Sequence, residues 1–108
     1  MDYLEEIIQL TMTYLGLTEN GSYYVELSHY VRTAIMLCTM QTGQTDFSDD
    51  TAKQWVQYTA AQMFADRFGE LNNKENSAVS QIIRNLTFCL QQKNRRKAVE
   101  LENSDDVP

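Results

Sequence analysis

The residue types that most often carry catalysis are scarce in this chain of 108 residues. The only histidine is His29, which lies between Ser28 and Tyr30 in a segment with helical periodicity. A nucleophilic site needs a base such as histidine beside a Ser or Cys, and an acidic group that orients the base. No recognisable motif around His29 supplies these roles. We therefore expect an exposed or interfacial histidine, and a protein that is not an enzyme.

Candidate metal ligands lack the spacing that a metal site requires. Asp46, Asp49 and Asp50 are close in sequence, but an EF-hand loop needs alternating ligands, a central Gly and a closing Glu. Cys38 and Cys89 are far apart, and neither has a second Cys or a His beside it, as a zinc site would require. The glycines fall at expected helix ends rather than in a phosphate-binding loop. We expect no metal and no cofactor, and we interpret the aspartates as a helix N-cap cluster.

A basic cluster near the end of the chain could bind phosphate or nucleic acid. It runs from Lys93 to Lys97 and includes Arg95 and Arg96. Cations are also common at a helix C-terminus because the helix dipole is negative there. The acidic residues that follow cancel the local field within about a Debye length, which favours this second interpretation. A third interpretation is a tail that becomes ordered when it docks to a partner.

Composition favours helices, and the charge disfavours nucleic-acid binding. Four glycines and a single proline are few for a turn-rich β-protein. The 43% of hydrophobic residues can form one core in a chain of 12.5 kDa. The formal charge of −6 lies wholly in residues 1–90, because the basic and acidic residues from 91 onward balance. Such an acidic body should repel the phosphate backbone of nucleic acids.

Neither a targeting segment nor a membrane span is expected. The segment Met1–Glu6 has three acidic residues and no cation, unlike a secretory or organellar signal. No apolar run approaches the roughly 18 residues that a membrane span needs. We interpret both cysteines as reduced core thiols of a protein that is assembled in the cytoplasm.

Hydrophobic periodicity predicts a compact all-α bundle of about four helices. The expected helices cover about residues 3–15, 23–42, 50–68 and 77–92, and Trp55 should be the largest contribution to the core. The third helix should be capped by the aspartate cluster and the fourth by Ser77. We expect one helical domain over residues 1–92. Residues 93–108 should form a charged and flexible tail, either frayed helix or disordered.

Several side chains exceed what one small core can hide. Residues 35–38 are apolar on every side of the second helix, so another subunit is a candidate for part of their cover. Arg67 follows the apolar stripe of the third helix and needs a partner, either in the chain or across a subunit contact. Six tyrosines also favour an interface, where tyrosine is enriched. This profile is typical of an assembly or adaptor protein.

The order of the segments resembles a known family. The likeness spans about residues 4–90 and is carried by Tyr24–Leu27, Thr42-Gly43, Ala60–Glu70 and Ile82–Arg84. This arrangement resembles the head–tail connector (head-completion adaptor) proteins of tailed bacteriophages. The stretch Phe64–Arg67 resembles the aromatic-x-x-Arg motif of that family, with Phe in place of the usual tyrosine, and Arg84 lies where a late arginine is often found.

The resemblance implies a ring of about twelve copies beneath the portal of the capsid, assembled in the host cytoplasm and retained in the virion. Such a ring extends the DNA channel, joins a tail-joining protein, and lets DNA pass along a negative lumen. The implied subunit-interface residues are Tyr24, Tyr30, Met36, Arg67 and Arg84. The implied portal-docking residues are Lys93, Arg95, Arg96, Lys97 and Leu101.

An alternative function is a small acidic helical regulator that binds a single protein partner as a monomer or dimer. A transcription factor is a weaker alternative because the chain has no basic recognition helix. Connector and regulator both need aromatic surface and no active site, so the residues alone separate them poorly.

Overall fold

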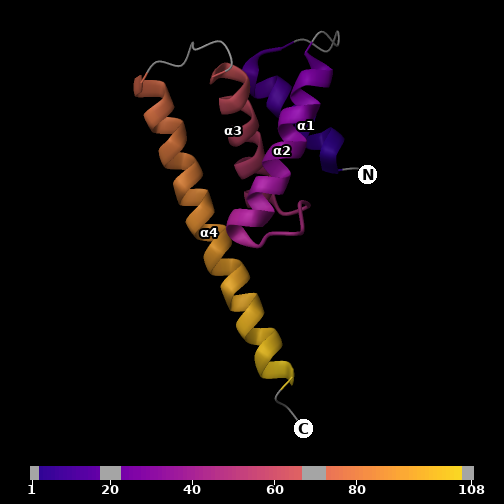
Figure 1. Cartoon of the computed structure of the whole chain (residues 1–108), viewed down its shortest axis with the longest axis vertical. Helices are drawn as coiled ribbons and strands as arrows, with labels where there is room; N and C mark the ends of the chain where they lie inside the picture. Colours follow the sequence, from indigo (N-terminus) through magenta and orange to yellow (C-terminus); the bar gives the residue numbers. More distant parts are fainter. Residues whose placement is uncertain (1–2, 18–22, 67–72, 106–108) are drawn as a thin grey trace.

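The protein is an all-α bundle. The computed structural model describes residues 3–17, 23–66 and 73–105, with side chains described in 3–17, 23–66 and 78–99. All regular secondary structure in these ranges is helical (Figure 1), and the helices are α1 (Tyr3–Leu15), α2 (Tyr24–Thr42), α3 (Asp50–Asp66) and α4 (Asn73–Asp105). The predicted class, all-α with about four helices, is confirmed.

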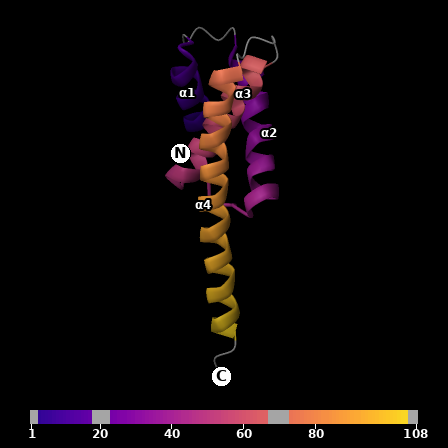
Figure 2. The same ribbon diagram turned by 90° about the vertical axis from the view of Figure 1, so that its left-hand side faces the viewer.

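Helix α3 lies at the centre of the bundle. It packs against α1, α2 and α4, whereas α1 and α4 do not touch each other in the described residues. Trp55 and Val56 are fully buried, and Ala52 and Ala60 allow neighbouring helices to approach closely. Figure 2 shows α4 in front, with α1 and α2 on either side of it. Helices α1 and α4 therefore present two separate sides of the molecule.

Local signals set two of the helix ends as expected. Gly43 ends α2 in the left-handed conformation, with φ of 78°, and its amide donates to the carbonyl of Thr39 at 2.9 Å. Glycine adopts this conformation without the penalty that a Cβ brings. Asp49 precedes α3, and its carboxylate accepts a hydrogen bond from the Ala52 amide at 3.1 Å. The predicted aspartate cap of the third helix is confirmed.

The broad apolar surface of α2 is explained mostly within the chain. Helices α1, α3 and α4 all pack against it. Cys38 is fully buried, and Ile35 and Leu37 are half-buried against the core. Of residues 35–38 only Met36 points to solvent, with 56% of its surface exposed. Of these four residues, Met36 is therefore the one that the chain itself leaves uncovered.

Helix α4 is longer than the sequence pattern predicted. It begins at Asn73, so Ser77 lies inside the helix and the prediction that it caps this helix is wrong. It also continues past residue 92 to Asp105, without a break at the expected boundary between domain and tail. Of the two alternatives for residues 93–105, helix and disorder, the structure shows helix. Apolar periodicity fades there, but Lys, Arg, Ala, Glu and Leu are good helix formers and no Gly or Pro interrupts them.

Helix α4 is anchored along its first two thirds. Leu90 is fully buried, and the Trp55 indole nitrogen donates to the Thr87 hydroxyl at 2.7 Å. The Asn94 amide donates to the Thr42 carbonyl and to Gln44 Oε1, both at 3.0 Å. Beyond Asn94 the helix projects from the bundle, as Figure 1 shows. This projection makes the molecule 57 Å long, against 33 and 17 Å in the other directions.

The two cysteines have different surroundings. Both are free thiols, but Cys38 is buried and Cys89 is exposed. Burial raises the pKa of the Cys38 thiol, and a hydrogen bond with Thr42 opposes this rise. The prediction of a core thiol is wrong for Cys89, because its side of α4 faces away from α2 and α3.

Candidate interaction surface

The residues considered for chemistry do not assemble into a reactive site. Among the described residues, no group of three or more His, Cys, Asp or Glu side chains is placed to hold a metal ion. His29 is exposed on α2, and its ring forms an edge-to-face arrangement with the Tyr30 ring at a centroid distance of 6.1 Å. The depressions on α4 are open hollows along its outer surface, lined by residues such as Phe88, Gln92 and Arg96. The surface of α4 is therefore suited to contact with a large partner rather than to enclosing a small one.

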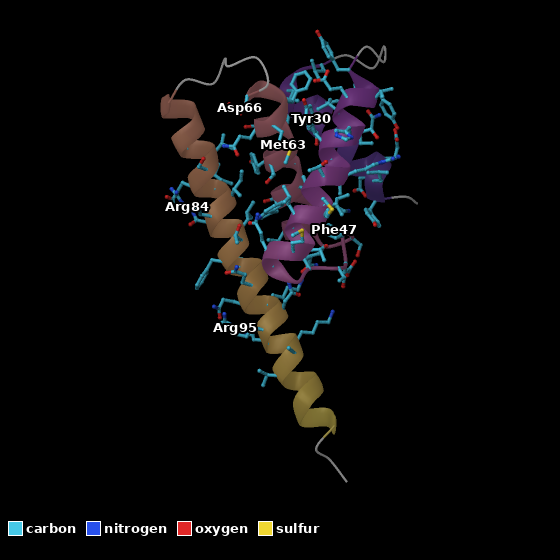
Figure 3. The ribbon with its side chains drawn as sticks, viewed as in Figure 1. Tyr30, Phe47, Met63, Asp66, Arg84 and Arg95 are labelled. Atoms are coloured by element: carbon cyan, nitrogen blue, oxygen red, sulfur yellow. The ribbon has the colours of Figure 1, made fainter. Side chains whose placement is uncertain are left out.

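The side of α4 that faces away from the bundle combines arginines with apolar groups. Figure 3 shows Arg84 and Arg95 on this side. Helical spacing places other exposed residues on the same side, and Phe88 and Val99 are 62% and 49% exposed. We call the set the outward α4 face, and its residues are Arg84, Phe88, Gln92, Arg95, Arg96 and Val99. An aromatic ring beside arginines is a composition enriched in protein interfaces.

Charge is segregated along the chain. Residues 78–99 contain five basic and no acidic residues, a formal charge of +5. Residues 1–77 contain eleven acidic and four basic residues, a formal charge of −7. Residues 100–108 add four acidic residues, so the basic stretch is confined to the middle of α4, which lies along one side of the bundle. This segregation makes the two regions complementary to each other and to partners of opposite sign.

The four cations of the 93–97 segment divide into two pairs. Lys93 forms an ion pair with Asp49, and its hydrogen bond lowers the pKa of that carboxyl against the opposing effect of burial. A hydrogen bond from Ser48 is the main cause of a lowered pKa at Asp46, and the positive charge of Lys97 adds to it. Lys93 therefore anchors α4 to the chain's own α2–α3 connection, and Lys97 adds positive charge near it.

Arg95 and Arg96 form the second pair. Both side chains are exposed, and neither makes an ion pair within the described residues. Both guanidinium groups are thus available to a partner. The helix contains Leu101, whose side chain lies outside the described residues.

The two tyrosines predicted at a subunit interface lie at the edge of the chain's own core. Tyr24 and Tyr30 are half-buried and pack against the core cluster. The Tyr24 hydroxyl donates to the Glu5 carboxylate on α1. The Tyr30 hydroxyl donates to Glu26, one turn earlier on α2, at 3.3 Å. Both side chains therefore contribute to the monomer, and each keeps an exposed portion.

The other predicted interface residues are distributed over different elements. Met36 lies on the outer side of α2, and Arg84 on the outward α4 face. The Arg84 guanidinium donates to Gln81 Oε1 of its own helix at 2.9 Å. Arg67 lies outside the described residues. The structure thus brings Arg84 together with Arg95 on one face, and leaves Met36 on another.

Sequence reasoning missed the apolar neighbours of these residues. Val25 and Met40 share the outer side of α2 with Met36, and they are 79% and 74% exposed. We call Val25, Met36 and Met40 the outward α2 face. Their signal was present, because all three positions lie opposite the buried stripe that contains Leu27 and Val31. Phe88 was missed in the same way, opposite Leu90 on α4.

Comparison of the chain with protein-family models, with curated proteins and with solved structures finds no match. None of the helices in the described ranges has the length and apolar character needed to cross a membrane.

Proposed function

We propose that the protein is a structural subunit of a homo-oligomeric ring at the head–tail junction of a tailed bacteriophage. The ring contains about twelve copies, lies beneath the capsid portal, extends the DNA channel and receives a tail-joining protein. The resemblance of Tyr24–Leu27, Ala60–Glu70 and Ile82–Arg84 to connector proteins suggests this role. In this proposal the protein has no catalytic activity.

The observation that carries the proposal is the presence of two unlike, unpartnered helical faces on one small bundle. The outward α4 face contains arginines and Phe88, whereas the outward α2 face contains Val25, Met36 and Met40, with the exposed His29 and Arg32 between them. Exposed apolar side chains gathered on one face are typical of an interaction site. A subunit with two different contact faces associates head to tail, and such contacts close into a ring when the rotation between copies allows it.

The acidic body supports a role beside DNA rather than bound to it. Residues 1–77 carry a formal charge of −7. A channel wall of this sign repels phosphates, so DNA slides through without being held. We propose that DNA contacts the ring only as a passing strand.

The projecting end of α4 is the proposed contact with the portal. Beyond Asn94 the helix leaves the bundle and extends to Asp105. A helix that is already formed loses less conformational entropy on docking than a disordered tail does. The candidate docking residues lie in or next to this projection, and they are Lys93, Arg95, Arg96, Lys97 and Leu101.

Native mass spectrometry of the purified protein over a range of concentrations tests the ring. A discrete species of about twelve or thirteen copies, with a central channel in negative-stain electron microscopy, supports the proposal. A dimer as the largest species favours the alternative, a helical regulator of one partner protein. If only monomers and dimers form at every concentration, this result counts against a ring that assembles without its partners.

A substitution on the outward α2 face tests whether that face takes part in assembly. Met36→Glu places a charge at a 56%-exposed position, so the monomer should remain folded while ring formation is lost. Gln41→Glu near the end of α2 is the matched control, because it introduces the same charge at an exposed helical position outside the outward α2 face. Met36 is a cleaner test than Tyr30, which packs against the core. Rings of unchanged abundance in Met36→Glu would exclude this face from the interface.

A further inference from the structure

We propose that the outward α4 face of one copy docks on an acidic edge of a second copy of the same chain. The acidic edge comprises Asp46 and Asp50, and its partners are Arg95 and Arg96. This inference rests on the proposed ring and assigns two surfaces to its subunit contact. If Arg95 and Arg96 form the subunit contact, the proposed portal-docking element consists of the helical residues beyond Val99, which include Leu101.

The acidic edge is accessible and lies between α1 and α4, and the Asp46 carboxylate also accepts hydrogen bonds from Ser48. Asp46 and Asp50 are both exposed. Between them, the ring of Phe47 stacks on Tyr3 of α1 at a centroid distance of 5.8 Å. One turn into α3, Lys53 pairs with Glu6 of α1 at 2.9 Å. The edge also borders the side of α4 that contains Lys93 and Lys97. Arg95 lies on the outward α4 face (Figure 3), so the two surfaces are distinct regions of one molecule, as a head-to-tail contact requires.

The ion pair between Lys93 and Asp49 shows that the two surfaces lie at the same level along the axis of α4. Lys93 pairs with Asp49, so this point of α4 is level with the start of α3. Arg95 and Arg96 lie within one turn of Lys93, and Asp50 adjoins Asp49. Copies related by rotation about an axis parallel to α4 keep these heights. The arginines of one copy therefore reach the level of the acidic edge of the next.

Charge also opposes the main alternative, in which α4 pairs with α4 of a second copy. Residues 78–99 contain no carboxylate. Contact between the outward α4 faces of two copies would bring their arginines together with no carboxylate of the same segment to offset them, and like charges at an interface are repulsive. Against the acidic edge, the same arginines meet carboxylates, which guanidinium groups bind with two parallel hydrogen bonds. Phe88 and Val99 supply apolar area beside these pairs.

A charge swap in the full-length chain tests the contact. The first variant is R95E/R96E, the second is D46R/D50R, and the third combines all four substitutions. Asp49 is left unchanged because it caps α3 and pairs with Lys93. Circular dichroism and urea unfolding establish that each variant is folded. Assembly is followed by native mass spectrometry and sedimentation at low and high salt.

We expect each double variant to assemble with an affinity at least about tenfold lower than that of the wild type, because two attractive pairs become repulsive. The fourfold variant should restore assembly, since it recreates opposite charges across the contact. High salt should weaken assembly of the wild type and of the fourfold variant alike.

The outcomes separate this contact from the proposed function. Rings that survive both double substitutions overturn the contact and leave the ring proposal standing. Assembly lost in R95E/R96E but not restored in the fourfold variant also overturns it. Open chains that are restored by the swap support the contact and count against a closed ring. A wild type that stays monomeric at low salt up to its solubility limit overturns the contact.

Discussion

Leu90 offers a direct measurement of how strongly α4 is held to the bundle. It is the fully buried side chain among the described residues of α4, where the other apolar residues are half-buried or exposed. Replacement by alanine removes its branched end from a position with 0% exposure. Because the surrounding helices relax only partly into the resulting cavity, we expect a loss of about 3 kcal/mol in the free energy of unfolding.

Phe88→Ala is the matched control. Phe88 lies two residues earlier on the opposite side of the same helix and is 62% exposed. Its truncation removes a larger group, yet it leaves no internal cavity. The higher helix propensity of alanine offsets part of the lost contact. We expect its free energy of unfolding to stay within about 0.5 kcal/mol of the wild-type value.

Urea unfolding, followed by circular dichroism at a dilution where the protein is monomeric, measures both changes. If the free energy of unfolding falls with urea concentration at the same slope in both variants and the wild type, the proteins unfold between comparable states. In thermal unfolding, Leu90→Ala should lower the Tm by about 12 °C or more, on a scale of roughly 4–8 °C per kcal/mol for a domain near this size. Equal losses for the two variants would refute the assignment of the buried and outward sides of α4.

Two further predictions concern single groups. Asp49 has a lowered pKa because Lys93 donates a hydrogen bond to it, so its charge stabilises the fold above the unfolded pKa of about 3.9 and this contribution is lost as pH falls through the folded pKa. Asp49→Asn keeps a capping side chain, so we expect the free energy of unfolding at pH 7 to fall by less than about 1 kcal/mol. This difference from the wild type should shrink below about pH 4. A difference in urea unfolding that does not change with pH would contradict this. Cys89 is exposed and Cys38 is buried, so a thiol reagent should label Cys89 rapidly and Cys38 only when the protein unfolds. A Cys89→Ser variant that is still labelled rapidly in native buffer would contradict the burial of Cys38.

Local signals in the sequence determined most of the helices. The first predicted helix, residues 3–15, coincides with α1, because its apolar stripe and Gly16 are both local features. The end of α2 at Gly43 and the cap of α3 by Asp49 were predicted for the same reason. Helix hydrogen bonds join residues four apart, so a short window of sequence contains most of the information.

The length of α4 was not determined by the apolar pattern. The stripe fades after Leu90, and that fading suggested an end near residue 92. The segment beyond it is helical because its residues have high helix propensity and because Lys93 and Asn94 are anchored to the connection between α2 and α3. That anchor joins residues more than forty positions apart, which no local pattern reveals.

The candidate interaction surfaces were decided by the tertiary structure. Sequence patterning placed Met36 in an interface and Cys89 in the core, but it could not show which side of a helix its neighbours leave open. Three helices pack against α2 and two against α4, and Met36, Phe88 and Cys89 lie on the sides that these contacts leave open. The types of residue, the charge of each segment and the helices themselves follow from the chain alone. Which faces remain free depends on contacts between residues far apart in the chain, and these exist only after the helices pack.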